Sequence, residues 1–148
     1  MLAINKRLEL VASYVENKRL ADIGSDHAYL PIFLAKEGKI DFAIAGEIVD
    51  AITLEDNIEV ITICGMGGKL ISDILEDGKD KLINKPNLIL QPNVGESFVR
   101  EKLQQLGYNI VAENIIEEDG HIYEIIVAKA GEMKLTEEEK VFGEYLLK

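Results

Sequence analysis

Two glycine-containing turns and one acidic strand end hold the side chains of this sequence that could do chemistry. The first turn spans residues 22–27, between an apolar strand pattern and an apolar helix pattern. Gly24 has no Cβ atom, so the backbone can lie close to a ligand there, and free N–H groups at the start of the next helix can bind a carboxylate or a phosphate. An ordinary strand-to-helix loop has the same pattern, so this turn alone does not define a site.

An acidic residue, Glu47, ends the next strand pattern about twenty residues further on, at a spacing that suits the hydroxyl groups of a ribose. The second glycine turn, Gly65-Met66-Gly67-Gly68, follows a later strand pattern. It also allows a ligand to approach the backbone, although a helix that simply needs small residues at its start would look the same. Together the three strand ends favour a ligand site.

The elements that must position these groups alternate between strand and helix. We expect strands at residues 19–23, 41–47, 57–64, 86–90, 108–117 and 122–128, and helices at residues 5–15, 27–37, 69–82, 95–106 and 136–148. Either Ser25 or Asp26 is expected to cap the second helix. The strand at residues 41–47 is apolar, as a strand buried on both faces should be.

The last two strands decide the subclass of the fold. They are separated by a turn containing Asp119-Gly120, a pair that suits a type I′ hairpin. A dinucleotide-binding sheet continues with parallel strands, whereas a methyltransferase sheet closes with such a hairpin. The sequence therefore predicts one α/β domain over residues 1–148, with a Rossmann-like, mostly parallel sheet, a C-terminal antiparallel hairpin and helices on both faces.

The connection between the second and third predicted strands is unusually short. Only residues 48–56 separate them, with no convincing helix. A parallel crossover normally needs about a dozen residues or more, and usually a helix. We therefore expect a segment to be missing between Asp50 and Ala51.

Composition narrows the function classes. The net charge of -11 argues against nucleic-acid binding through the surface as a whole, and the single cysteine, Cys64, excludes an intrachain disulfide. No apolar run approaches membrane-spanning length, the N-terminus lacks a signal-peptide pattern, and no Cys/His cluster suggests a metal site. We expect a cytoplasmic protein in which Cys64 is buried, while Arg100 and Lys102 are solvated on their helix face.

Several strings spread over nearly the whole chain match one family. They are Lys6-Arg7-Leu8, Val11-Ala12-Ser13-Tyr14, residues 21–31, Ala43-Ile44-Ala45-Gly46-Glu47, Gly65-Met66-Gly67-Gly68, Leu90-Gln91-Pro92-Asn93 and Tyr123-Glu124-Ile125. In this order they resemble the bacterial tRNA (adenine-N1)-methyltransferases that modify adenosine 22. Compared with that family, this sequence is expected to lack a helix, a strand and an adenine-holding loop after Glu47, and a C-terminal helical domain after Lys148.

The resemblance implies S-adenosylmethionine as the methyl donor and tRNA as the substrate. We expect a monomer that needs no metal and no membrane. The resemblance also implies that Asp22 and Gly24 shape the pocket for the methionine end of the cofactor. Glu47 would accept hydrogen bonds from both ribose hydroxyls. The cofactor-binding residues implied in this way are Asp22, Gly24, Ser25, His27, Glu47, Gly65, Met66 and Gly67.

Three further residues are candidates for catalysis. Adenine N1 has a lone pair at neutral pH, so the transfer depends mainly on positioning, and a carboxylate at Asp26 would stabilise the cationic product. Tyr29 would stack on the target adenine, and Asn93 would hydrogen-bond its edge. The alternatives are helix caps for Asp26 and Asn93 and a core position for Tyr29. His27 would orient Asp26, contact RNA, or be only structural.

Two other function classes remain open. An NAD-dependent oxidoreductase shares the argument for Glu47 but needs Gly-x-Gly-x-x-Gly after its first strand, and the run after Gly24 has no second glycine. A catalytically inactive, methyltransferase-like nucleotide- or RNA-binding module would be distinguished from an enzyme by its affinity for the cofactor.

Replacement of Asp26 by asparagine (Asp26→Asn) tests the proposed carboxylate. We expect turnover to fall far more than the affinity for S-adenosylmethionine, because the carboxylate would stabilise charge that grows only in the transition state. Methyl-transfer kinetics and calorimetry measure these two quantities. Equal activity of the variant would leave Asp26 as a helix cap only.

Overall fold

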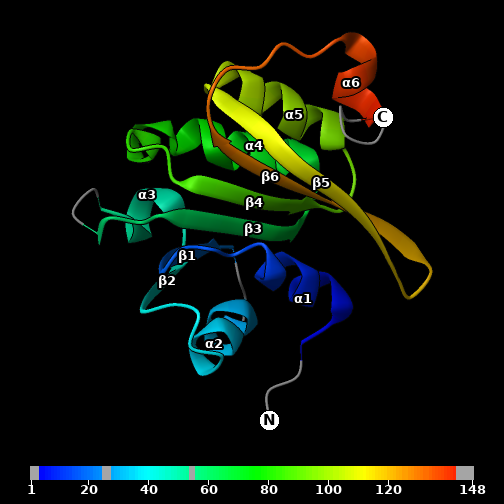
Figure 1. Cartoon of the computed structure of the whole chain (residues 1–148). Helices are drawn as coiled ribbons and strands as arrows, with labels where there is room; N and C mark the ends of the chain where they lie inside the picture. The colour runs from blue at the N-terminus through cyan, green and yellow to red at the C-terminus, as the bar shows by residue number, and fades with distance from the viewer. Residues whose placement is uncertain (1–3, 25–27, 54–55, 143–148) are drawn as a thin grey trace.

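A six-stranded sheet forms the middle layer of the structure, with helices on both of its faces (Figure 1). This computed structural model describes residues 4–24, 28–53 and 56–142. The strands are β1 (Arg19–Ile23), β2 (Phe42–Gly46), β3 (Val60–Met66), β4 (Asn87–Pro92), β5 (Tyr108–Glu118) and β6 (His121–Ala130). The helices are α1 (Lys6–Ser13), α2 (Tyr29–Lys36), α3 (Ile48–Ala51), α4 (Gly68–Asp77), the 3-10 helix η2 (Lys79–Leu82), α5 (Glu96–Gln105) and α6 (Glu137–Phe142).

The sheet has the order β2-β1-β3-β4-β6-β5. The first four strands in this order pair in parallel, and β6 is antiparallel to both β4 and β5. Asp119 and Gly120 both have positive φ angles, 52° and 81°, as a type I′ turn requires. The predicted fold class, a mostly parallel sheet closed by an antiparallel hairpin, is therefore confirmed.

Each face of the sheet has its own apolar cluster, because side chains alternate between the faces along a strand. Leu20 of β1 belongs to the cluster that includes residues of α1 and α2. Ala21 and Ile23 belong to the other cluster, with residues of α4 and α5. The same alternation places Asp22 on the face covered by α1 and α2, and this decides which side of the sheet carries the site.

Strand β2 lies at the edge of the sheet and pairs with β1 alone among the described residues. Its burial alternates, and Ala43 and Ala45 are exposed. The expectation of a strand buried on both faces is therefore wrong. The apolar composition of β2 is that of an inner strand, but no further strand covers its outer side in the part of the chain that the structure describes.

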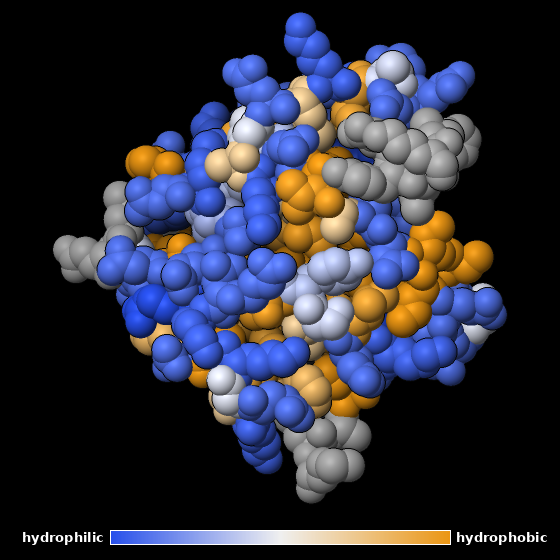
Figure 2. Space-filling view, viewed as in Figure 1, coloured by the Kyte–Doolittle hydropathy of each residue, from blue (hydrophilic) through white to orange (hydrophobic). Residues whose placement is uncertain are grey.

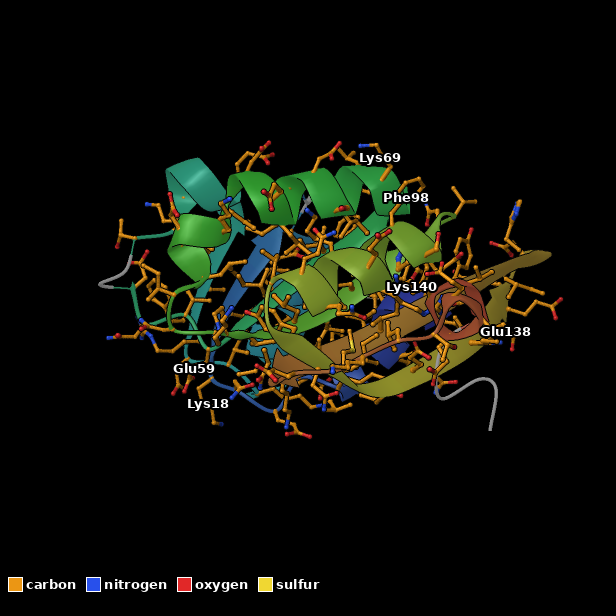
Figure 3. The ribbon with its side chains drawn as sticks, turned by 90° about the horizontal axis from the view of Figure 1, so that it is seen from above. Lys18, Glu59, Lys69, Phe98, Glu138 and Lys140 are labelled. Atoms are coloured by element: carbon orange, nitrogen blue, oxygen red, sulfur yellow. The ribbon has the colours of Figure 1, made fainter. Side chains whose placement is uncertain are left out.

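The connection from β2 to β3 is closed by one helical turn, α3, and β3 begins at Val60, later than expected. Both strands flank β1 in parallel. Glu59, just before β3, accepts hydrogen bonds on Oε1 from the backbone N–H groups of Lys18 (3.1 Å) and Arg19 (3.0 Å), which fixes the starts of β1 and β3 side by side (Figure 3).

The start of α2 and the end of α4 differ from those expected. Helix α2 begins at Tyr29 with Ala28 at its N-cap position, so the predicted cap at Ser25 or Asp26 is wrong. These two residues and His27 lie outside the described residues. Helix α4 ends before Gly78, and η2 completes the stretch predicted as one helix.

Arg100 of α5 is fully buried, so the expectation of a solvated side chain is wrong. Its guanidinium donates to Glu113 Oε1 at 2.9 Å and to Glu124 Oε2, and so joins α5 to both strands of the hairpin. It also donates to the backbone carbonyls of Lys140 (3.1 Å) and Val141 (2.8 Å). Arg100 therefore holds α6 against the domain through the carbonyl groups at the end of that helix.

The surface is largely hydrophilic in the view of Figure 2, in keeping with the net charge of -11. An apolar area lies at the right of that view, over the hairpin of β5 and β6. Ile115 and Ile122 of this hairpin are exposed. None of the helices within the described ranges is long and apolar enough to cross a membrane.

Replacement of Arg100 by alanine (Arg100→Ala) should destabilise the domain by about 3–5 kcal/mol, because it leaves the buried Glu113 carboxylate without a counter-charge. Thermal or denaturant unfolding measures the change. The control is Lys69→Ala, which removes an exposed i,i+4 pair with Asp73 and should cost less than about 1 kcal/mol. Equal, small effects of the two substitutions would contradict the structural role of Arg100.

Candidate functional site

Polar side chains gather at the carboxyl ends of β1, β3 and β4, on the face of the sheet covered by α1 and α2. Asp22 on β1 is in register with Thr62 on β3, and Cys64 on β3 is in register with Gln91 on β4. Residues in register on neighbouring strands point to the same face, so these four side chains form two adjacent pairs. The parallel strands thus bring together groups that lie far apart in the sequence.

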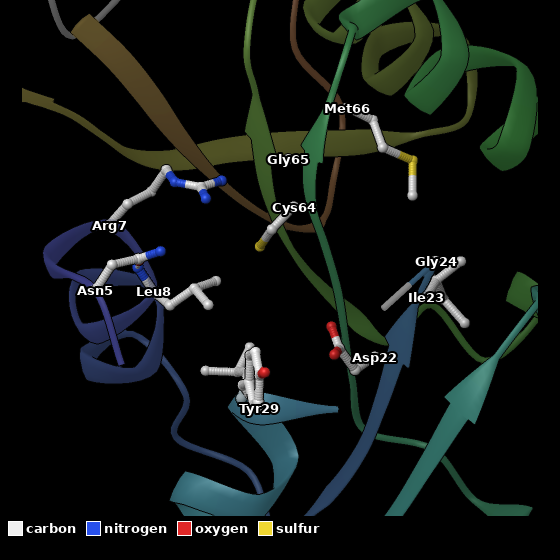
Figure 4. Close-up of a pocket in the computed structure, with 11 residues that line it drawn as sticks. Asn5, Arg7, Leu8, Asp22, Ile23, Gly24, Tyr29, Cys64, Gly65 and Met66 are labelled. Atoms are coloured by element: carbon white, nitrogen blue, oxygen red, sulfur yellow. Dashed lines mark hydrogen bonds between the residues drawn. The ribbon is translucent and has the colours of Figure 1, made fainter. Parts of the chain in front are cut away.

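A cavity of about 470 Å³ opens over these strand ends (Figure 4). Its walls come from β1, β3, α1 and the start of α2. The lining residues are Asn5, Arg7, Leu8, Asp22, Ile23, Gly24, Tyr29, Leu30, Cys64, Gly65 and Met66. Five residues expected from the sequence at a ligand site therefore line one cavity: Asp22, Gly24, Tyr29, Gly65 and Met66.

Asp22 and Cys64 lie on the sheet side of this cavity. Asp22 is 5% exposed, and its Oδ1 accepts a hydrogen bond of 2.8 Å from the Thr62 hydroxyl. Burial raises the pKa of the Cys64 thiol, and the nearby Asp22 carboxylate raises it further, against a lowering effect of Arg7. The thiol therefore stays protonated at neutral pH and is unsuited to act as a nucleophile.

The two glycines of the cavity have the left-handed backbone that favours glycine, with φ of +74° at Gly24 and +78° at Gly65. A Cβ atom at Gly24 would lie 1.9 Å from Cε of Met66. The amide of Gly24 donates to the carbonyl of Gly46 at 3.1 Å, which ties the turn to the end of β2. The two predicted turns are thus in contact, and a side chain at Gly24 would displace the end of the Met66 side chain.

Three other predicted residues lie beside the cavity and do not line it. Glu47 borders a separate cavity of about 110 Å³ with residues of α3 and α4. Gly67 is the N-cap residue of α4. The amide of Asn93 donates to the carbonyl of Met66 at 2.8 Å, and the Asn93 side chain contacts Gln91. Ser25, Asp26 and His27 fall outside the described residues, so their placement relative to the cavity stays a prediction.

The alternative role of Asn93 as a helix cap is wrong, because Gly95 occupies the N-cap position of α5. Tyr29 is half-exposed at the cavity, so the alternative of a core tyrosine is also wrong. Cys64 lines the cavity and is partly exposed there, so the expectation of a fully buried cysteine is wrong. Within the described ranges, no group of three His, Cys, Asp or Glu side chains could hold a metal ion.

Arg7 and Gln91 were not expected at the site from the sequence. Gln91 is fully buried at the end of β4, and its Oε1 accepts from the guanidinium of Arg7 and, at 3.0 Å, from the amide of Gly65. Both residues fall within strings that carry the family resemblance. The position of Gln91 at a strand end before Pro92-Asn93 is the local signal that could have pointed to it.

Two family models match the chain and together span it almost entirely. The model described as "tRNA (adenine(22)-N(1))-methyltransferase" matches residues 49–148, and a general "Methyltransferase domain" model matches residues 4–54. The change from one match to the other falls around Asp50 and Ala51, where the sequence predicts a missing segment.

Individual relatives agree with these matches. A tRNA (adenine(22)-N(1))-methyltransferase of Bacillus subtilis is 45% identical and is aligned over 88% of this chain and 67% of its own length. The crystal structure of the B. subtilis m1A22 tRNA methyltransferase TrmK has a TM-score of 0.92 at 38% identity, covering 99% of this chain and 77% of that one. Sp1610 of Streptococcus pneumoniae, in complex with S-adenosyl-L-methionine, has a TM-score of 0.90 at 45% identity, covering 96% and 80%.

The alignment to the B. subtilis sequence contains many unmatched positions. It runs over 159 positions but takes in 88% of the 148 residues, or about 130. About 29 positions of that relative therefore face no residue of this chain.

Replacement of Gly24 by alanine (Gly24→Ala) should lower the affinity for S-adenosylmethionine by about tenfold or more, or about 1.4 kcal/mol. The added Cβ displaces the Met66 side chain from the cavity wall. Gly38→Ala is the matched control, because Gly38 has nearly the same φ, +72°, with nothing within 4 Å of the added atom. Both variants should lose about 1–2 kcal/mol of stability through backbone strain. Calorimetry should show weakened binding only for Gly24→Ala, and equal binding by both variants would contradict this account.

Proposed function

The chain belongs to the tRNA (adenine(22)-N(1))-methyltransferase family, and we propose that it transfers a methyl group from S-adenosylmethionine to N1 of adenosine 22 in tRNA at the cavity over β1 and β3. The observation that carries the proposal is the meeting of both glycine turns, Asp22 and Tyr29 in one cavity of about 470 Å³. Parts of three strings that carry the family resemblance line this cavity, at the carboxyl ends of parallel strands, where open α/β sheets bind their ligands.

The residues present fit the cofactor at the β1 side of the cavity. S-adenosylmethionine supplies a methyl group on a positively charged sulfonium. The backbone at Gly24 leaves space that a Cβ atom would fill, and the Asp22 carboxylate beside it suits the ammonium group at the methionine end. Glu47 follows β2, which neighbours β1, and its exposed carboxylate is available to the ribose hydroxyls.

The target base fits at the α1 and α2 side of the cavity. Tyr29, half-exposed at the wall, offers an aromatic face on which an extruded adenine stacks. Asn93 is held by Gln91, whose Nε2 donates to its Oδ1 at 3.1 Å. This contact orients the Asn93 side chain and leaves its N–H groups for the proposed hydrogen bond to the base edge.

Catalysis in this arrangement comes mainly from positioning. Adenine N1 carries a free lone pair at neutral pH, so no side chain has to remove a proton before attack. The protein's task is to hold N1 in line with the methyl group and to exclude water. Since the methylated base is a cation, the Asp26 carboxylate is proposed to stabilise the charge that grows during the transfer.

We also propose that a segment present in relatives is absent between Asp50 and Ala51. The two family matches overlap there, and about 29 positions of the B. subtilis relative are unmatched. In the described ranges, β2 is also an apolar strand with no strand on its outer side. The intact mass of the protein purified from its native source tests this point. A mass equal to that of the 148-residue chain would show that the protein itself lacks the segment, and a mass larger by about 29 residues would contradict the proposal.

The proposed enzyme acts as a monomer in the cytoplasm, where its tRNA substrate is found. The single cysteine and the tRNA substrate support the cytoplasmic location.

Methyl transfer from labelled S-adenosylmethionine to an unmodified tRNA transcript tests the function directly. We expect label in 1-methyladenosine, identified by mass, because the proposed cofactor and base sites adjoin in one cavity. A transcript with guanosine at position 22 is the matched control and should receive no label. Cofactor binding without transfer would instead favour a binding module, the second function class.

A further inference from the structure

Arg7 brings a positive charge to a cavity whose other described lining residues include no lysine or arginine. It lies on α1, opposite Asp22, and its guanidinium points toward Cys64 and Gly65 (Figure 4). The pKa of Cys64 responds to Asp22 and Arg7 in opposite senses, which places both charged groups near this thiol. The cavity therefore has an acidic side at β1 and a basic side at α1.

The guanidinium of Arg7 is held in place by neighbours that carry no charge. Nη1 donates to Oε1 of Gln91, which is itself fully buried. The guanidinium carbon lies 5.1 Å from the centre of the Tyr123 ring, in a cation–π arrangement. A Cβ atom at Gly65 would lie 3.4 Å from Nη1, so the glycine backbone lets β3 pass close to Arg7. Arg7 is fixed before any ligand arrives.

These contacts leave the positive charge of Arg7 without a counter-charge and some of its N–H groups without an acceptor among the described residues. Gln91 is neutral, and no carboxylate forms an ion pair with the Arg7 side chain in the part of the chain that the structure describes. Nε and Nη2 have no hydrogen-bond partner among those residues. A planar guanidinium with free, fixed N–H donors matches the geometry of an oxyanion and binds it through paired hydrogen bonds.

We infer that Arg7 is the oxyanion-binding residue of this site, and that it holds an anionic group of one of the two ligands of the proposed reaction. The inference rests on the proposed function for the identity of those ligands. The oxyanion is either the carboxylate at the methionine end of S-adenosylmethionine or a backbone phosphate next to the extruded adenosine. The carboxylate is planar and the phosphate is tetrahedral, and one arginine can bind either anion through two of its oxygen atoms.

Binding measurements with three variants test the inference. Arg7→Gln removes the charge, Arg7→Lys keeps the charge without the fork of donors, and Lys6→Gln removes the charge of an exposed neighbour on the same helix. Calorimetry measures binding of S-adenosylmethionine and of its decarboxylated analogue. Filter binding measures the affinity for tRNA over a range of KCl concentrations. Circular dichroism of each variant checks that it is folded.

We expect Arg7→Gln to lower the affinity for one of the two ligands by about tenfold or more, because a charge-assisted hydrogen bond is lost. Lys6→Gln should lower neither affinity by as much. If the carboxylate is the partner, the wild type prefers S-adenosylmethionine to the decarboxylated analogue and Arg7→Gln loses that preference. If a phosphate is the partner, cofactor binding is unchanged and the slope of log affinity for tRNA against log salt falls by about one.

Unchanged binding of both ligands by Arg7→Gln overturns the inference, as does an equal loss in Lys6→Gln. If Arg7→Gln does not fold, Arg7→Lys carries the test, with a smaller loss expected in the same ligand. The readouts are binding affinities, so the inference is tested apart from the reaction. A wild-type chain that binds a ligand through Arg7 but transfers no methyl group would refute the proposed function and leave the role of Arg7 standing.

Discussion

The site depends on the hydrogen bonds of the Gln91 side-chain amide, because they join α1, the end of β3 and the end of β4. Its Oε1 accepts from Arg7 of α1 and from the amide of Gly65 at the end of β3. Its Nε2 donates to the carbonyl of Pro92 and to Oδ1 of Asn93, both at 3.1 Å. Since Gln91 is fully buried, its amide depends on these protein partners in place of water. The cavity walls are therefore fixed relative to one another.

The fold could be predicted from local patterns to a large extent, because the pattern of apolar, polar and turn residues that defines each strand and helix extends over only a few residues. The Asp119-Gly120 pair is a clear case, since the turn it favours is the turn observed. Arg100 shows the limit. Nothing within α5 distinguishes it from a solvated arginine, and its burial depends on Glu113, Glu124 and α6, which are remote in the sequence.

The site could be predicted where one rule applied, namely that the carboxyl ends of parallel strands meet at one edge of the sheet. Asp22 and the glycine turns were found in this way. Arg7 was missed because α1 precedes the first strand, and its docking is decided by contacts with the hairpin such as that between the Arg7 amide and Glu118 Oε2 at 3.0 Å. Glu47 obeys the strand-end rule but borders a neighbouring cavity.

The uncovered edge of β2 gives this protein a route to self-association. The outer backbone groups of β2 have no strand partner in the described part of the chain, and the small side chains of Ala43 and Ala45 would not obstruct an incoming strand. Asp41 and Glu47 flank the strand, and such charges protect natural sheet edges against aggregation. Asp41 and Glu47 of two copies would repel each other when their β2 edges meet, and dissolved ions screen this repulsion. This chain should therefore aggregate more as the ionic strength rises, whereas salting-in would increase its solubility.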